Sequence, residues 1–132
     1  MASLGVAFDG RNPLDVLQEQ ARAAEMAGAS TLWMSSHLFL RDPFTMAALV
    51  LEATQTPRVA LMAVSPHAVH PVHIAMAAAT LDELAPGRVV LCLGTGAPGD
   101  LADAGVEPRR PLRMLAEGVG AVRLLLSGEP AR

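Results

Sequence analysis

Four short apolar runs recur along the chain at nearly constant intervals, and this repeat constrains the fold more than any other feature. The runs cover residues 4–8, 31–34, 59–64 and 89–93, and they begin 27, 28 and 30 residues apart. A strand followed by a helix and its loops takes up about 30 residues. The spacing therefore predicts four successive strand–helix units.

Helical patterns separate the apolar runs and complete each unit. We expect Asn12 to cap the first helix and Asp42 to cap the second, because each side chain stands directly before a proline suited to a first helical turn. The last helix is expected to follow a long loop over residues 98–108. The prolines near the four helix starts are Pro13, Pro43, Pro71 and Pro111.

Strand–helix alternation implies an α/β fold with a parallel sheet and right-handed crossovers. Two architectures fit four such units. One is a small, open, doubly wound sheet, and the other is part of a (β/α)₈ barrel, which normally needs about 250 residues. The chain has 132 residues, so its length and periodicity leave both architectures open.

Composition narrows the classes of partner and compartment. The formal net charge is −3 and the ten basic residues are scattered, which argues against a nucleic-acid or anionic-membrane partner. Neither a basic-led signal peptide nor about 20 uninterrupted apolar residues are present. One cysteine allows no intrachain disulfide, so we expect a cytoplasmic protein. The hydrophobic fraction of 52% is high for a small domain and indicates apolar surface meant for a partner. The single cysteine, Cys92, is expected to be a core residue.

We expect the functional site at the segment that ends in Gly94, Thr95 and Gly96. Residues 89–93 predict a parallel strand buried on both faces, and the glycine loop follows at its carboxyl end, where parallel α/β proteins bind ligands. A dinucleotide fingerprint would need its third glycine to open a helix, whereas we expect a long loop over residues 98–108, and a P-loop would need a following lysine. A tight turn without a ligand remains an alternative for this loop.

The histidines differ in what their positions allow. His37 follows the second predicted strand, so it falls at the same edge of the sheet as the glycine loop, where an imidazole can transfer a proton near neutral pH. His67, His70 and His73 are divided by Pro71 between a loop and a new helix, which argues against convergence on a metal. We therefore predict no metal site.

Ordered motifs along the whole chain resemble those of one known family. They are Glu25-Met26-Ala27-Gly28, Thr31-Leu32-Trp33 with His37, Asp42-Pro43, Thr56-Pro57-Arg58-Val59, His70-Pro71, Ala75, Thr80-Leu81-Asp82, Gly87-Arg88 and Leu93-Gly94-Thr95-Gly96. This order resembles the amino-terminal half of the luciferase-like flavin monooxygenase superfamily, most of all the branch that uses the deazaflavin coenzyme F-420. The resemblance implies four βα units that form the first half of a (β/α)₈ TIM barrel, as one half-barrel domain over residues 1–132.

The resemblance also implies a layout for the site. A flavin or deazaflavin ring would lie at the carboxyl ends of the strands, against a non-prolyl cis peptide that the motifs place at Ala63–Val64. Gly94-Thr95-Gly96 would run along the ring, and His37 would serve in proton transfer or orientation. Ser36 stands where the family commonly has Asp, so it can donate a hydrogen bond to the cofactor but supplies no charge.

The resemblance implies an oxidoreductase that transfers hydride or activates oxygen, with coenzyme F-420 or, as the alternative, FMN. Its substrate would be a small molecule. Ala97 replaces the acid often found after the glycine loop in sugar-phosphate dehydrogenase relatives, which argues against a sugar-phosphate substrate.

The sequence ends at Arg132, shortly after the fourth predicted helix, whereas family members continue for about as many residues again. Half of a barrel would leave its first and last strands with unpaired edges. We therefore expect either a homodimer or a complementary half-barrel chain as partner. The alternative function is a catalytically inactive, truncated half-barrel that acts as an assembly partner or is a remnant.

Overall fold

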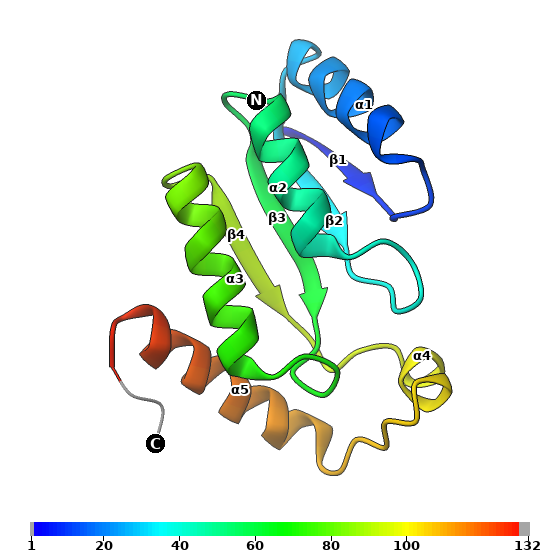
Figure 1. Cartoon of the computed structure of the whole chain (residues 1–132), viewed down its shortest axis with the longest axis vertical. Coiled ribbons are helices and arrows are strands. Elements are labelled where there is room, and N and C mark those ends of the chain that lie inside the picture. Colours follow the sequence, from blue (N-terminus) through cyan, green and yellow to red (C-terminus); the bar gives the residue numbers. More distant parts are fainter. Residues whose placement is uncertain (1, 130–132) are drawn as a thin grey trace.

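The computed structural model describes residues 2–129 and shows strands and helices in strict alternation over its first four units (Figure 1). The predicted domain over residues 1–132 includes four positions, 1 and 130–132, that lie outside this range. The elements are β1 (Leu4–Phe8), α1 (Leu14–Met26), β2 (Ala29–Ser35), α2 (Pro43–Ala53), β3 (Arg58–Val64), α3 (Pro71–Leu84), β4 (Val89–Leu93), α4 (Pro98–Asp103) and α5 (Pro111–Leu126).

The four strands form one parallel sheet in the order β1-β2-β3-β4. Ala7, Trp33, Ala60 and Val90 stand side by side in adjacent strands. Because all strands run the same way, their carboxyl ends meet at one edge of the sheet. The prediction of four parallel βα units is confirmed.

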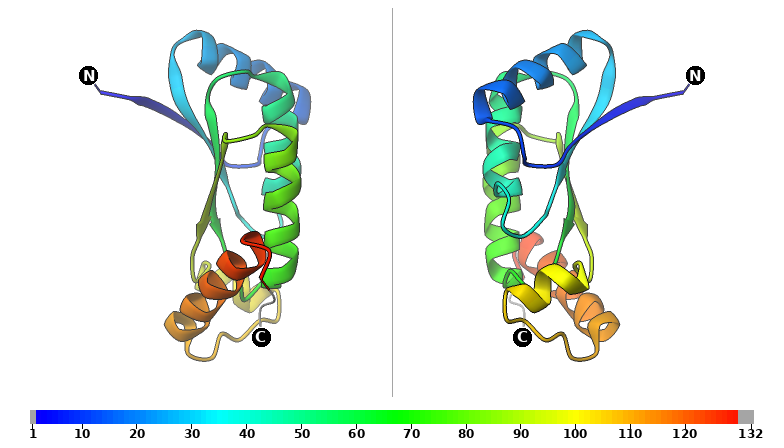
Figure 2. Two further views of the ribbon diagram at one scale, coloured as in Figure 1. Left: turned by 90° about the vertical axis from the view of Figure 1, so that its left-hand side faces the viewer. Right: turned by 90° about the vertical axis from the view of Figure 1, so that its right-hand side faces the viewer.

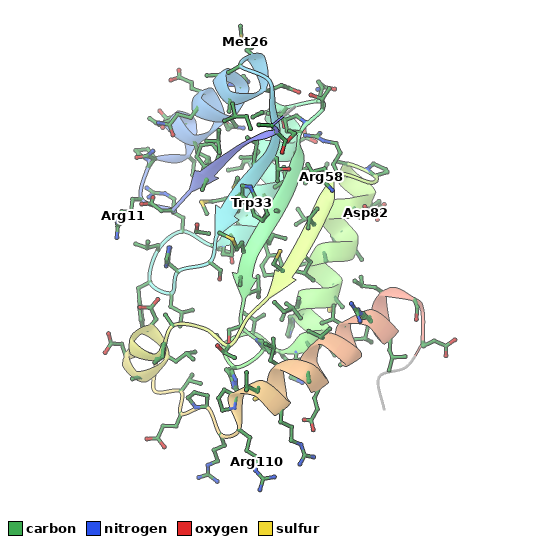
Figure 3. All side chains as sticks on the ribbon, turned by 180° about the vertical axis from the view of Figure 1, so that it is seen from behind. Arg11, Met26, Trp33, Arg58, Asp82 and Arg110 are labelled. Carbon is green, nitrogen blue, oxygen red and sulfur yellow. The ribbon has the colours of Figure 1, made fainter. Side chains whose placement is uncertain are left out.

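Helices α1, α2 and α3 all cover the same face of the sheet (Figure 2). The core lies between them and the strands, where Leu32, Met34, Val59 and Leu61 pack against helix residues such as Ile74. No helix covers the opposite face within residues 2–129, and Figure 3 looks onto that open face. Helix α5 packs against α3 instead of extending the layer along β4.

The prediction that residues 89–93 form a strand buried on both faces is wrong for β4. All five of its residues are only half-buried, including Cys92, so the expectation of a core cysteine is also wrong. The apolar run identifies the strand correctly at residues 89–93. Its exposure has a structural cause, because β4 is the last strand of the sheet and one of its faces is open.

Helix starts agree with the sequence analysis in part. Asp42 caps α2, since its Oδ2 accepts hydrogen bonds from the Thr45 backbone N–H at 2.7 Å and from the Thr45 hydroxyl at 2.8 Å. The prediction for Asn12 is wrong: Pro13 itself occupies the N-cap of α1, one position later, and the Asn12 amide donates to Gln20 Oε1 at 3.0 Å.

A short helix interrupts the long loop predicted over residues 98–108. Helix α4 begins at Pro98, buries Leu101, and ends before Gly105, which has a positive φ of 72°. The Pro- and Gly-rich composition of the segment concealed the helix, although proline in a first turn is compatible with one. As a result, the chain after β4 returns to the carboxyl end of the sheet before α5 begins.

Candidate functional site

Three loops meet at the carboxyl ends of β2, β3 and β4, and hydrogen bonds join them in order. The Ser36 amide donates to the Met62 carbonyl at 2.8 Å, which ties the loop after β2 to β3. The Gly94 amide donates to the Val64 carbonyl at 3.0 Å, which ties the glycine loop to the end of the same strand. The end of β3 is therefore the centre of the arrangement.

Gly94 lies so close to β3 that no other residue fits there without movement. A Cβ atom at this position would stand 2.9 Å from the Ala63 Cβ, closer than carbon atoms normally approach. The sequence identified this glycine as part of a tight turn or a cofactor loop, and the structure supplies a steric reason for it.

The non-prolyl cis peptide lies at Met62–Ala63, one bond earlier than the predicted Ala63–Val64. The β3–β4 pairing shifts register between Leu61 and Val64, so the strand is irregular at this point. Motif spacing locates the irregular segment but not the bond within it, because nothing in the residue types of Met62, Ala63 and Val64 marks one bond over the next.

Ser65 anchors the glycine loop, and the sequence analysis did not identify it. Its hydroxyl donates to the Thr95 carbonyl at 3.1 Å and accepts from the His67 amide at 3.2 Å, while only 6% of the residue is exposed. Gly96 has a φ of 86°, and a Cβ there would lie 3.0 Å from Ser65 Oγ. The available signal was a small hydroxyl residue directly after the third strand, opposite the glycine loop.

A small cavity of about 30 Å³ lies beneath these loops. Its lining includes Ser36, Ala63, Ser65, Gly96 and Asp100. This volume can hold a water molecule, but it is far below the 300–1,000 Å³ or so of typical cofactor pockets.

The predicted site residues fall into two groups. Ser36, Ala63 and Gly96 line the cavity together, and Gly94 contacts Ala63 directly. Val64 lies at the same strand end, but its side chain is fully buried in the helix-covered core, so only its backbone faces the loops.

His37 is exposed in the loop after β2 and does not line the cavity. Within residues 2–129, its imidazole makes no hydrogen bond to another side chain or to the backbone. The ring is therefore free to meet a ligand that lies over the carboxyl ends of the strands.

The opposite ends of β3 and β4 carry a different kind of structure. Arg88, just before β4, donates from Nε to the Pro57 carbonyl at 2.9 Å, and from its two terminal nitrogens to the Thr54 carbonyl at 2.9 Å and hydroxyl at 2.7 Å. Burial lowers the pKa of Arg88, although the charge of Glu25 opposes that shift.

Glu25, at the end of α1, holds the chain just before β3. Its Oε1 accepts from the amides of Gln55 and Thr56 at 2.9 and 2.7 Å and from the Thr56 hydroxyl at 2.9 Å. Desolvation alone would raise the pKa of Glu25, but these hydrogen bonds and the charge of Arg88 outweigh it and lower the pKa. None of these groups lies at the carboxyl ends of the strands.

Residues 2–129 contain no group of three or more His, Cys, Asp or Glu side chains placed to hold a metal ion. His70 instead caps α3, where its Nδ1 accepts from the Val72 amide at 3.2 Å. In the same described range, none of the helices has the length and apolar character needed to cross a membrane.

Comparison with known proteins gives one family and a consistent set of relatives. The family described as luciferase-like monooxygenase matches residues 3–132. The 5,10-methylenetetrahydromethanopterin reductase of Methanolobus tindarius is 24% identical over 127 residues, which are 96% of this chain and 39% of that protein. The 4-hydroxyprotoasukamycin monooxygenase of Streptomyces nodosus subsp. asukaensis is 30% identical over 117 residues, 84% of this chain and 32% of that protein.

Solved structures share the fold. The coenzyme F-420-dependent tetrahydromethanopterin reductase of Methanopyrus kandleri superposes with a TM-score of 0.82 at 18% identity, over 94% of this chain and 39% of that one. The oxygenating constituent of 3,6-diketocamphane monooxygenase from Pseudomonas putida, in complex with FMN, gives 0.82 at 24% identity, over 95% of this chain and 40% of that one.

The chain thus spans about two fifths of the length of these solved structures. Their fold is that of a TIM barrel, and the four strand–helix units match its amino-terminal part. Of the two architectures that the sequence left open, the half-barrel is confirmed and the small doubly wound sheet is wrong.

Proposed function

Since the chain belongs to the luciferase-like monooxygenase family, we propose that it forms one wall of the cofactor site of an oxidoreductase. The reaction is hydride transfer or monooxygenation of a small-molecule substrate. The cofactor is coenzyme F-420 or, as the alternative, reduced FMN, both of which carry a hydride equivalent on their ring system.

The observation that carries this proposal is the contact between Gly94 and Ala63. Without a side chain at Gly94, the glycine loop packs directly onto the end of β3, and the two backbones form a continuous surface with only a methyl group between them. Flat rings bind to apolar surfaces with few projecting atoms and a small number of well-placed polar groups. The surface lies where barrel enzymes bind their ligands.

The polar groups around this surface suit a flavin-type ring. Within residues 2–129, the backbone amides of Thr95 and Gly96 donate to no acceptor, so both remain available to a ring carbonyl or nitrogen. Ser36 contributes a hydroxyl at the edge of the same surface. We propose that Ala63, Gly94, Thr95 and Gly96 contact the cofactor ring. In the same proposal, the backbone of Val64 supports the surface beneath the ring, and Ser36 lies at the edge of that surface.

His37 is the proton-transfer residue in this proposal. It follows β2 at the same edge of the sheet, it is exposed, and no partner within the described residues restrains its imidazole. A histidine in that position can donate or accept a proton at the substrate or at the ring near neutral pH.

Two choices stay open within the proposal and are decided by experiment. Named relatives include a coenzyme F-420-dependent reductase and an FMN-bound monooxygenase, so the family supports either cofactor. Within residues 2–129, the sheet has one open face and two free edges, which favours, as the second candidate function, an inactive half-barrel that serves only in assembly.

Titration of oxidised coenzyme F-420 and of FMN with the purified 132-residue chain tests the proposal, with ring fluorescence as the signal. The matched variants are Gly94→Ala, which forces the loop off Ala63, and Gly99→Ala, where a Cβ meets no atom within 4 Å. We expect saturable quenching by the unmodified chain and by Gly99→Ala, and at least about tenfold weaker binding by Gly94→Ala, a difference of about 1.4 kcal/mol.

Quenching by one cofactor alone identifies the coenzyme. Equal binding by both glycine variants contradicts the assignment of the ring to this loop. Absence of binding for both cofactors, in a chain that circular dichroism shows to be folded, favours the inactive half-barrel.

A further inference from the structure

The loop between β2 and α2 holds one residue in an unusual backbone conformation. Phe39 has a φ of 66°, in the left-handed region that bulky side chains rarely adopt. It is the third residue of a turn that the Leu40 amide closes by donating to the His37 carbonyl at 3.4 Å. Turns with a positive φ at this position favour glycine or asparagine. Phenylalanine is therefore an unfavourable choice for the conformation of this loop.

Burial of the side chain within residues 2–129 does not offset this strain. Phe39 is 71% exposed, and Leu40 beside it is 38% exposed. Leu38 behaves differently, because it lines the small cavity beneath the loops together with Ala63 and Ala97. The loop thus packs on its neighbours through Leu38 and leaves the phenylalanine ring projecting from the surface.

The loop is held at both ends by groups other than this aromatic ring. At its start, the Ser36 amide donates to the Met62 carbonyl at 2.8 Å. Near its end, the Arg41 guanidinium donates to the carbonyls of Gly10 and Arg11 at 3.1 and 2.9 Å. These hydrogen bonds fix the loop to β3 on one side and to the loop after β1 on the other. The aromatic ring is therefore not needed to shape the turn.

The position of the loop places the ring beside the candidate site. Figure 1 shows the loop leaving the sheet at the carboxyl end of β2, and Leu38 lines the same cavity as Gly96. His37 belongs to the same turn as Phe39. Strained backbone that its surroundings enforce is concentrated at active sites and ligand clamps. In barrel enzymes, the loops after the strands build the active site.

We propose that Phe39 contacts the substrate, and that its ring stacks on a planar aromatic part of the substrate beside His37. This inference rests on the proposed function, which places the cofactor ring over Ala63 and Gly94 and proton transfer at His37. Aromatic pairs gain from offset or edge-to-face packing beyond the area that they bury. The substrate class is therefore a flat aromatic small molecule, and the exposed Leu40 extends the apolar rim that receives it.

Titration of the isotope-labelled chain with 2-naphthol tests the contact, with the backbone amide signals in the NMR spectrum as the readout and no cofactor present. The saturated analogue 2-decalol is the control ligand, because it has the same carbon skeleton without a flat aromatic face. Phe39→Asn removes the ring and keeps a residue that tolerates a positive φ. Met26→Asn is the matched control, since Met26 is 89% exposed at the end of α1, far from the carboxyl ends of the strands.

We expect 2-naphthol to shift the amide signals of residues 37–41 saturably in the unmodified chain and in Met26→Asn. Binding by Phe39→Asn should be at least about tenfold weaker, and 2-decalol should bind the unmodified chain more weakly than 2-naphthol. Equal affinity of Phe39→Asn and the unmodified chain overturns the proposal. So do equal binding of the two ligands, main shifts outside residues 37–41, and absence of 2-naphthol binding.

Thermal unfolding separates a ligand contact from a packing role. Phe39→Asn should unfold at the same temperature as the unmodified chain or a higher one, because it relieves strain without removing a buried contact. A lower unfolding temperature than that of Met26→Asn shows that the ring supports the fold, and it overturns the proposal.

The absence of cofactor from these titrations keeps the two proposals distinguishable. A chain that binds 2-naphthol through Phe39 but neither coenzyme F-420 nor FMN supports the aromatic contact and contradicts the proposed function. A chain that binds a cofactor at the glycine loop but shows no Phe39-dependent binding of 2-naphthol supports the proposed function and overturns the substrate contact.

Discussion

The two ends of the parallel sheet are built by different means. At the amino ends of β3 and β4, charged side chains hold the backbone: Arg88 donates to the Pro57 and Thr54 carbonyls, and Glu25 accepts the amides of Gln55 and Thr56. At the carboxyl ends the loops are held by backbone hydrogen bonds and a single hydroxyl, that of Ser65, around two glycines.

We infer that the amino ends of the strands serve stability, and we propose that the carboxyl ends serve ligand binding. Long side chains at the amino ends satisfy carbonyls and amides that would otherwise be left without partners. Short side chains at the carboxyl ends leave amides and an imidazole free. Barrel enzymes follow the same division, with conservation of structure at one end and chemistry at the other.

Replacement of His37 should produce the largest functional effect without a structural one. We expect His37→Gln to lower turnover by a factor of about 100 to 10,000, the usual contribution of a positioned acid or base. Its exposed ring makes no hydrogen bond within residues 2–129, so unfolding by urea should change by less than about 0.5 kcal/mol. His73→Gln on α3 is the control. A loss of stability in His37→Gln would contradict the claim that His37, at the carboxyl end of the sheet, does not support the fold.

Replacement of Arg88 should instead lower the stability of the fold. Arg88→Met removes the hydrogen bonds to Pro57 and Thr54 and leaves their carbonyls unpaired, so we expect a loss of about 2 to 3 kcal/mol in the free energy of unfolding. Arg113→Met, which breaks an exposed pair with Glu117, should cost no more than about 0.5 kcal/mol. Equal unfolding midpoints for the two variants in urea would contradict the role given to Arg88.

Replacement of Ser65 sharpens the comparison, because this buried hydroxyl is the side chain that anchors the glycine loop. Ser65→Ala loses the hydrogen bond to the Thr95 carbonyl, worth about 1 kcal/mol, and we expect cofactor affinity to fall about fivefold. Thr80→Ala removes a comparable hydroxyl bond to the Met76 carbonyl on α3 and should leave affinity unchanged. Identical dissociation constants for both variants would remove Ser65 from the site.

The smallest expected effect is an acid-dependent loss of stability at Glu25. Its pKa is lowered in the folded chain, so its contribution is present above the ordinary pKa of glutamate, about 4.3, and is lost as the pH falls through the lowered folded value. Glu25→Gln should therefore flatten the pH dependence of the unfolding free energy in that acid range. An unchanged slope would show that the carboxylate is not stabilised in the folded state.

The sequence predicted the regular elements better than the irregular ones. Strands β1 and β4 begin and end where their apolar runs do. The exposure of β4 could not be predicted in this way, since it depends on what lies beyond the edge of the sheet. Helix α4 was missed because its six residues are too few for a helical pattern to emerge.

The candidate site was outlined through family motifs and not through local chemistry, and its role in cofactor binding stays a prediction. The structure gives a steric reason for Gly94 and Gly96 in the Cβ contacts with Ala63 and Ser65. Ser65 itself was missed, because a single serine after a strand is indistinguishable from an ordinary loop residue until its distance to the Thr95 carbonyl is known. The cis peptide was placed one bond too late, because the residue types of Met62, Ala63 and Val64 do not mark which bond is cis.

Hydrogen exchange with and without bound cofactor tests most directly whether the ligand binds at the carboxyl ends of the strands and not at the amino ends, because one experiment measures amides at both ends. The cofactor should slow exchange at the amides of Thr95 and Gly96, which donate to no acceptor within residues 2–129, and leave those of Gln55 and Thr56 unchanged. Protection at Gln55 and Thr56, or none at the glycine loop while the cofactor is bound, would contradict the assignment of the ligand to the carboxyl ends of the strands.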